Sequence, residues 1–135
     1  MTSLESIPET LGITAPLVLK GGVHWLEPGV MTVRELAASM NALQARFITI
    51  TAYQLPHDEG FRLEYHWDLG GQLLGFPFVL AGNSIDSIYD LCEAVDWIER
   101  EIHEGFAIDF LGRTYEPLLL RQGDTPGVNL REEVK

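Results

Sequence analysis

The feature that most constrains the fold is a pair of apolar runs separated by two adjacent glycines. Residues 61–69 alternate apolar and polar side chains, and residues 72–80 form a second run after Gly70 and Gly71. Two glycines in this position are typical of a two-residue β-hairpin turn, because glycine accepts the positive φ angles that such turns need. The pattern predicts an antiparallel hairpin. Period-two spacing places four side chains of its first strand on one face: Phe61, Leu63, Tyr65 and Trp67.

A third strand is predicted immediately before this hairpin. β-branched and aromatic residues alternate from Phe47 to Tyr53, and a turn-like Pro-His-Asp-Glu-Gly segment follows at residues 56–60. Three consecutive antiparallel strands are therefore expected. Pro77 lacks the backbone N–H that a ladder needs, so the last strand is expected to be at a sheet edge or bulged there.

A helix is predicted before the strands. Thr32 and Glu35 have capping-box spacing, in which the Thr hydroxyl and the Glu carboxylate each accept a hydrogen bond from an otherwise unpaired backbone N–H. Apolar residues then recur on one helical face as far as about Gln44, so this helix is expected to pack on the sheet. These residues are Val33, Leu36, Ala37, Met40 and Leu43.

A second helical pattern begins after Ser84. The sequence leaves open whether residues 84–105 form one helix or two. The apolar side of the pattern is made by Ile85, Ile88, Cys92, Val95, Ile98, Ile102 and Phe106. The charged residues are expected to form an acidic, exposed face: Glu93, Asp96, Arg100, Glu101 and Glu104.

These patterns divide the chain into three parts. Residues 1–30 contain three prolines and a Gly-Gly pair, and they predict an irregular arm with one possible strand at residues 17–25. Residues 31–120 predict a two-layer α+β domain, with a three- to four-stranded antiparallel sheet packed against helices. Residues 121–135 lack periodicity and predict a tail that docks on a partner.

Composition restricts the functional classes. The formal net charge is -11 over 135 residues, which opposes binding to a phosphate backbone, so we expect no nucleic-acid partner. The charge indicates either solubility alone or complementarity to a basic partner. No apolar run approaches the ~20 residues of a spanning helix, and no basic region precedes an apolar run at the N-terminus. We therefore expect a cytoplasmic protein whose membrane contact is indirect.

The chain offers little that favours catalysis or metal binding. The single cysteine, Cys92, is interpreted as a core thiol, and no Cys/His cluster has the spacing of a metal site. His66 and Asp68 share the polar face of their predicted strand, where a solvated or salt-bridged surface is the simpler interpretation. Residues 57–59 form a polar turn. We therefore predict no catalytic, cofactor-binding or metal residues, and leave a small hydrolase using His66 as a lesser alternative.

The most informative segment is residues 94–112, which combines a tryptophan, a compact charge triplet and an apolar run. Three consecutive residues cannot share one helix face, so at least one of the triplet turns inward or toward a partner while Trp97 anchors the packing. An ordinary amphipathic helix with solvated charges explains the same residues. The triplet is Glu99, Arg100 and Glu101.

This segment resembles the signature of the 30 kDa subunit family of complex I, the bacterial NADH:quinone oxidoreductase. The signature is a tryptophan followed by Glu-Arg-Glu, an acidic residue, a Phe-Gly-Ile-like step and Phe-x-Gly-His-Pro. The resemblance covers about residues 32–120. The matching residues are Trp97, Glu99, Arg100, Glu101, Glu104, Phe106, Ile108, Phe110 and Gly112.

Departures from the signature indicate a divergent branch. Gly105 replaces a usual Leu or Met, Ala107 replaces the usual Gly, and Arg113-Thr114 stands where the family has His-Pro. The tail around Leu130 and Arg131 is similar to a family Pro-Leu-Arg stretch without its second proline. The shortness of the chain favours the branch found in Ech-type and CO-induced energy-converting nickel–iron hydrogenases.

The resemblance implies a subunit without a cofactor of its own in the peripheral arm of an NADH:quinone oxidoreductase or of such a hydrogenase. It would pack against the hydrogenase-like large subunit and neighbour the iron–sulfur small subunit, on the cytoplasmic face of the inner membrane. A stand-alone acidic protein-binding domain is the alternative. The expected interface residues are Trp97, Glu99, Arg100, Glu101, Phe106, Phe110, Leu130 and Arg131.

Overall fold

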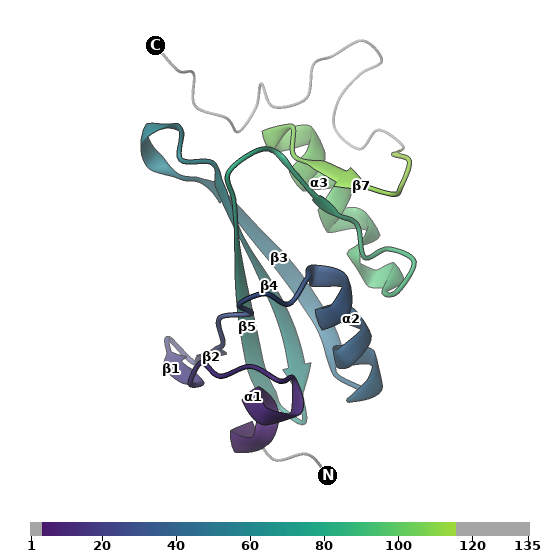
Figure 1. Ribbon diagram of the computed structural model, residues 1–135. Helices are drawn as coiled ribbons and strands as arrows, with labels where there is room; N and C mark the ends of the chain where they lie inside the picture. Colours follow the sequence, from purple (N-terminus) through teal and green to yellow (C-terminus); the bar gives the residue numbers. More distant parts are fainter. Residues whose placement is uncertain (1–3, 116–135) are drawn as a thin grey trace.

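The computed structural model describes residues 4–115, which form an α+β fold around a five-stranded sheet (Figure 1). The strand order is β1-β2-β5-β4-β3, and β6 pairs with β7 in a separate sheet. The strands are β1 (Val18–Lys20), β2 (Val23–Trp25), β3 (Arg46–Gln54), β4 (Phe61–Leu69), β5 (Gln72–Leu80), β6 (Ser84–Asp86) and β7 (Asp109–Leu111). The helices are α1 (Ile7–Thr10), α2 (Val33–Ala42) and α3 (Asp96–Phe106), with 3-10 turns η1 (Leu4–Ser6), η2 (Pro56–Asp58) and η3 (Glu93–Val95).

The predicted antiparallel strands are confirmed. β4 pairs with β5 along its whole length, with Leu69 opposite Gln72 at the turn. β3 pairs with the other side of β4, and a bulge interrupts this ladder between Phe47 and Thr49. The residues of β4 predicted to share one face are all buried: Phe61, Leu63, Tyr65 and Trp67.

The sheet has five strands rather than three to four, because the N-terminal segment adds a small hairpin. Where one strand was expected within residues 17–25, β1 and β2 pair with each other on either side of Gly21 and Gly22. β2 then runs parallel to β5, with Trp25 opposite Gly75. This approach needs glycine, because a Cβ on Gly75 would lie 2.7 Å from two ring carbons of Trp25.

Pro77 lies where β5 has a neighbour on one side only. β2 pairs with β5 at Leu74 and Gly75, and beyond that point β5 is paired with β4, where Pro77 stands opposite Glu64. A residue without an N–H is tolerated at such a local edge. The expected edge position of Pro77 therefore holds, within a strand that is otherwise internal.

The predicted capping box starts α2. The Glu35 N–H donates to the Thr32 hydroxyl at 3.1 Å, and the Thr32 N–H donates to the Glu35 carboxylate at 3.1 Å. The two bonds satisfy donors that the first helical turn leaves unpaired. The apolar face of α2 is buried through Val33, Leu36, Ala37 and Met40.

The helix expected from Ser84 is wrong over its first half. Residues 84–86 form β6, which pairs in parallel with β7, so that Ile85 lies opposite Phe110. A helix begins only at Asp96, after the turn η3. The apolar spacing of residues 85–92 suits a helix, but pairing with a strand more than twenty residues later in the sequence decides the local structure, and no local pattern reveals such a partner.

An aromatic cluster fills the core between the sheet and the helices. Trp67 packs edge-on against Phe47 and Phe76, with ring centroids 5.5 and 6.0 Å apart, and stacks with Tyr65 at 6.1 Å. Helices α2 and α3 lie along the same side of the sheet (Figure 1). The inward faces of β4 and of the helices thus share one apolar layer, which holds α3 in place.

Gly60 permits the turn between β3 and β4, and its substitution tests this geometry. Its φ is +104°, and an added Cβ would collide with the backbone oxygen of Leu80. We expect Gly60→Ala to lower the free energy of unfolding by about 2–4 kcal/mol, measured by urea denaturation.

The matched control is Gly71→Ala. Gly71 also has positive φ, at +89°, but no heavy atom lies within 4 Å of its added Cβ. We expect this variant to lose only about 1 kcal/mol, from backbone strain. Equal losses in the two variants would show that the contact with Leu80 is unimportant.

Candidate partner interface on helix α3

Helix α3 is held at both ends. The turn η3 precedes it, and the helix ends at Ala107, which adopts the left-handed conformation with φ of 57° and donates its N–H to the His103 carbonyl at 2.9 Å. The His103 ring is within hydrogen-bond distance of the Ile108 carbonyl, at 2.9 Å. These contacts fix the reversal of the chain from α3 into β7.

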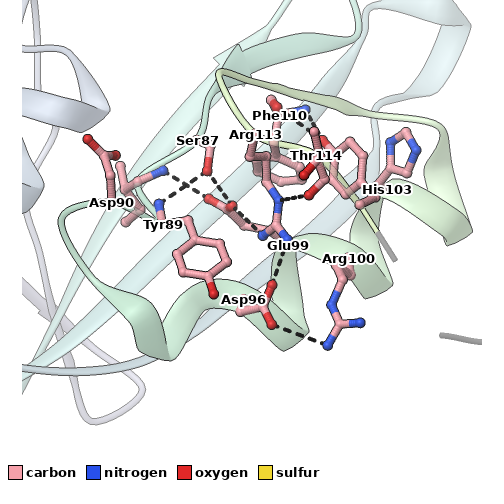
Figure 2. Close-up of polar contacts among 12 residues, drawn as sticks. Ser87, Tyr89, Asp90, Asp96, Glu99, Arg100, His103, Phe110, Arg113 and Thr114 are labelled. Carbon is pink, nitrogen blue, oxygen red and sulfur yellow. Dashed lines mark hydrogen bonds and ion pairs between the residues drawn. The ribbon is translucent and has the colours of Figure 1, made fainter. Parts of the chain in front are cut away.

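A carboxylate is buried on the inner face of α3. Glu99 is 0% exposed and accepts hydrogen bonds from the Ser87 hydroxyl at 2.6 Å, the Ile88 N–H at 3.1 Å and the Arg113 guanidinium at 3.2 Å (Figure 2). Burial raises the pKa of Glu99, although these three donors act in the opposite direction. A buried charge of this kind is tolerated only when its oxygens are satisfied.

Arg113 is the cation of this network. Its side chain is 6% exposed, and its second nitrogen donates to Asp96 at 2.6 Å. The guanidinium lies over the rings of Tyr89 and Tyr115, at 4.8 and 5.0 Å from their centroids. Burial opposes the charge, but the ion pairs with Asp96 and Glu99 hold the pKa of Arg113 above its ordinary value.

Tyr115 ties the segment after β7 to the helix. Its ring stacks on His103, with centroids 3.8 Å apart and planes at 2°. Its hydroxyl accepts from the Phe110 N–H at 2.5 Å and donates to the Phe110 carbonyl at 3.1 Å. Burial raises the pKa of Tyr115 to about 12. Tyr115 therefore joins α3 to β7 beside the hydrogen-bond network of Glu99.

The outer surface beside this network combines aromatic and guanidinium groups. Trp97 is 60% exposed, and the Arg100 guanidinium lies 5.9 Å from its ring centroid while pairing with Asp96 at 3.2 Å. A neighbouring hollow of about 230 Å³ is lined by Tyr89, Asp96, Arg100, Arg113 and Thr114. Exposed Trp, Tyr and Arg side chains that are held in fixed positions are typical anchors of protein interfaces.

The structure separates the predicted interface residues into three groups. Trp97 is well exposed, and Arg100 and Glu101 are partly exposed. Glu99 and Phe110 are completely buried inside the domain, and the partly buried Phe106 packs on Phe61 at 6.0 Å. Leu130 and Arg131 lie outside the described residues.

The acidic exposed face expected along this helix is only partly present. Glu93 is exposed and Asp96, Arg100 and Glu101 are partly exposed, but Glu104 is only 5% exposed. The expectation failed because α3 is packed on two sides, against β3 and against β7 with the segment that follows it.

Sequence reasoning did not assign a function to Ser87, Tyr89, Arg113 or Tyr115. Two signals were available: the similarity of Ser87-Ile88 to a helix entry in the resembling family, and the Arg-Thr pair at residues 113–114, which stands where that family has His-Pro. A departure of this kind does not reveal that Arg113 enters the core to pair with Glu99.

The polar residues considered for other chemistry lie apart from this network. His66 is 9% exposed and packs edge-on against Trp25 at 5.4 Å, and burial lowers its pKa. Among residues 4–115, no three His, Cys, Asp or Glu side chains are grouped as metal ligands would be. No helix in the same part of the chain is long and apolar enough to cross a membrane.

A family model matches residues 29–135, under the description respiratory-chain NADH dehydrogenase, 30 kDa subunit. The chain belongs to this family. Membership makes it a subunit of a respiratory oxidoreductase complex, whose other subunits are its partners. The family resemblance found in residues 94–112 is therefore confirmed.

Two solved structures share the fold of this 30 kDa family member. A trypsin-resistant fragment of Nqo5 has a TM-score of 0.62 and 20% identity, over 82% of this chain and 96% of the fragment. A chain of the membrane-bound sulfane sulfur reductase, an archaeal respiratory membrane complex, has a TM-score of 0.66 and 18% identity, over 91% of this chain and 78% of that chain. No curated protein sequence matches the chain.

The Glu99–Arg113 pair should be essential to stability in this family member. We expect Arg113→Met to lower the free energy of unfolding by about 3–5 kcal/mol, because it leaves a buried carboxylate without its cation. The double variant E99Q/R113M should lose less than the sum of the single variants. Urea denaturation gives all three values.

Arg46→Met is the control for loss of a cation. Arg46 pairs with Asp68 at 3.6 Å, but its side chain is 75% exposed, so we expect a loss of at most about 1 kcal/mol. Additive losses for Glu99 and Arg113 would contradict a direct interaction between them.

The raised pKa of Glu99 predicts a pH dependence. Because the folded state binds this proton more tightly than the unfolded state, acid favours folding. We expect the Tm of the wild-type chain to rise relative to that of Glu99→Gln as the pH falls from neutral through the folded pKa toward the ordinary value of 4.5. Differential scanning calorimetry measures the difference, and a constant difference in Tm would contradict the shift.

Proposed function

We propose that this chain is a non-catalytic subunit of the peripheral arm of an energy-converting complex, and that it packs against a hydrogenase-like large subunit. An iron–sulfur small subunit would be its neighbour, and the complex would lie on the cytoplasmic face of the inner membrane. Family membership supports a place in a respiratory complex. The surface around Trp97 supports contact with another protein.

Electron transfer in such a complex would belong to the partners. Iron–sulfur clusters are commonly held by four cysteine thiolates, and this chain has one cysteine. The residues that match the family signature instead have structural and surface positions. Glu99 and Phe110 hold α3 and β7 together from inside, while Trp97 and Arg100 remain at the surface.

The observation that carries the proposal is the exposed Trp97 beside the partly covered Arg100. Asp96 holds the guanidinium of Arg100 in place, so little side-chain freedom remains to be lost on binding. When a partner buries such a Trp and Arg pair, these two residues commonly contribute most of the binding free energy of the interface. The partners' surface should present an apolar pocket for the indole.

The hydrogenase branch is proposed over the NADH:quinone oxidoreductase branch on the departures from the family signature. Arg113 and Thr114 stand where the signature has His-Pro, and Arg113 is built into the core beside Glu99. The archaeal complex whose chain shares this fold is a sulfane sulfur reductase. The fold is therefore not restricted to complexes that oxidise NADH, which leaves room for a hydrogenase.

Copurification tests the proposal. We expect the tagged chain, recovered from gently solubilised host membranes, to bring down a nickel–iron hydrogenase-like large subunit with iron–sulfur partners, identified by mass spectrometry. Trp97→Ala should reduce this recovery about 30-fold, corresponding to about 2 kcal/mol of binding. The free energy of unfolding of the Trp97→Ala variant should differ from that of the wild type by less than about 1 kcal/mol, because the side chain is exposed.

Leu19→Ala is the matched control, since Leu19 is 64% exposed on the distant strand β1. It should leave recovery unchanged. Recovery of the chain alone would instead support a stand-alone acidic binding domain. Equal losses in the two variants would show that the Trp97 surface is not the interface.

A further inference from the structure

A polar hollow lies between the first half of α3 and the turn that follows β7. Its volume is about 230 Å³, and its wall includes two guanidiniums, those of Arg100 and Arg113 (Figure 2). This volume is far larger than the ~30 Å³ that one water molecule takes in the liquid. The end of a side chain from another protein can therefore enter the hollow.

A second, larger hollow adjoins the first and has a volume of about 640 Å³. The two hollows share three residues of their walls: Tyr89, Arg113 and Thr114. Trp97 is 60% exposed on α3, the helix that contributes Asp96 and Arg100 to the wall of the smaller hollow. A protein segment that covers the indole can thus also reach both hollows.

The smaller hollow offers donors that need an acceptor. The Nε of Arg113 donates to the Thr114 carbonyl at 3.1 Å, and its two terminal nitrogens donate to Glu99 and Asp96. A guanidinium has five N–H groups, so these three bonds leave two N–H groups of Arg113 without an acceptor among residues 4–115. The side chains of Tyr89 and Thr114, which carry hydroxyl groups, line the same hollow. The group that fits is an oxygen acceptor.

A carboxylate suits this wall better than a neutral carbonyl. The fork of a guanidinium binds both oxygens of a carboxylate, and such charge-assisted bonds are about twice as strong as neutral ones. Asp96 is the carboxylate in the wall, and it is already bound by Arg113 at 2.6 Å and by Arg100 at 3.2 Å. Ion pairs hold the pKa of Arg113 above its ordinary value, so this cation remains charged.

We infer that the hollow receives the side-chain carboxylate of an Asp or Glu residue of the large subunit, which binds beside Arg100 and Arg113 when Trp97 is covered. The inference rests on the proposed function and names the partner's group at the same surface. The formal net charge of -11 still favours a partner that is basic overall. A single carboxylate acts at contact distance, well within the screening length of about 8 Å at physiological salt.

Zero-length cross-linking tests the inference, because a carbodiimide joins an amine to a carboxylate only where the two groups meet. Thr114 is exposed at the hollow, so Thr114→Lys places an amine at its rim. The tagged variant is recovered with its partners from gently solubilised membranes, cross-linked and analysed by mass spectrometry. We expect the introduced amine to be joined to an Asp or Glu of the large subunit. The natural Lys20, on β1, is the internal control and should form no such link.

Recovery of the large subunit gives a second measurement. Arg100→Gln removes one cation from the wall and should reduce recovery by about 30-fold or more, because it leaves the partner's carboxylate poorly paired. Arg100→Lys keeps the charge and should lose less. Its amine also offers a second cross-linking position if Thr114→Lys prevents assembly.

The other outcomes overturn defined claims. Recovery that falls with Trp97→Ala, without a link from either introduced amine to the large subunit, rejects the carboxylate and retains the proposed function. Links that join these amines only to Asp90 or Asp96 of the chain itself lead to the same conclusion. Recovery of the chain alone rejects both the inference and the proposed function.

Discussion

The region around α3 depends on one buried carboxylate. Removing a charged group from water costs several kcal/mol, which must be offset by hydrogen bonds and an opposite charge. Glu99 receives these from three places in the chain: the hydroxyl of Ser87, the backbone of Ile88 and the guanidinium of Arg113. The first two follow β6 and the third follows β7. Satisfying one side chain therefore brings together two three-residue strands whose own pairing would be marginal.

The same network determines what the surface presents. Asp96 forms two ion pairs: one with Arg113 at 2.6 Å, on the inner side of the helix, and one with Arg100 at 3.2 Å, on its outer side. The carboxylates and guanidiniums balance one another, so the net negative charge of the chain does not concentrate here. The exposed surface consists of the Trp97 indole beside the Arg100 guanidinium, on a helix whose inner face is held by the Glu99 network. The proposed interface and the stability of the domain thus depend on neighbouring residues of the same helix.

Local patterns predicted the parts of the fold that are held by neighbours in sequence. The strands β3, β4 and β5 follow from alternation and from Gly70-Gly71, and α2 follows from Thr32 and Glu35. The parallel pairs β2–β5 and β6–β7 were not predicted, because each joins segments far apart in the chain. These pairs explain both the additional strands and the incorrect helix at residues 84–95.

The candidate site shows the same limit. Trp97 and its neighbours were proposed as interface residues on the basis of the family signature. Glu99 was included in the expected interface because it belongs to the charge triplet of the family signature, of which at least one side chain was expected to turn inward or toward a partner. Its spacing of three residues from Ile102 puts it on the apolar face of the helix. Phe110 was included because it matches the family signature, and its burial opposite Ile85 could not be foreseen from local patterns. Arg113 had no pattern that would predict its entry into the core.

The order of the strands also has a consequence for folding. β3, β4 and β5 are joined by short turns, so their contacts close small loops, whereas β2 must return to β5 across about fifty residues of chain. The three-stranded meander is therefore expected to form early, with its outer strand complete before α3 and the segment after β7 are in place. During synthesis the outer edge of β3 is exposed until the later segments η3 and α3 pack against it. That interval is the one in which a newly made chain is most prone to pair with the wrong neighbour, and to aggregate.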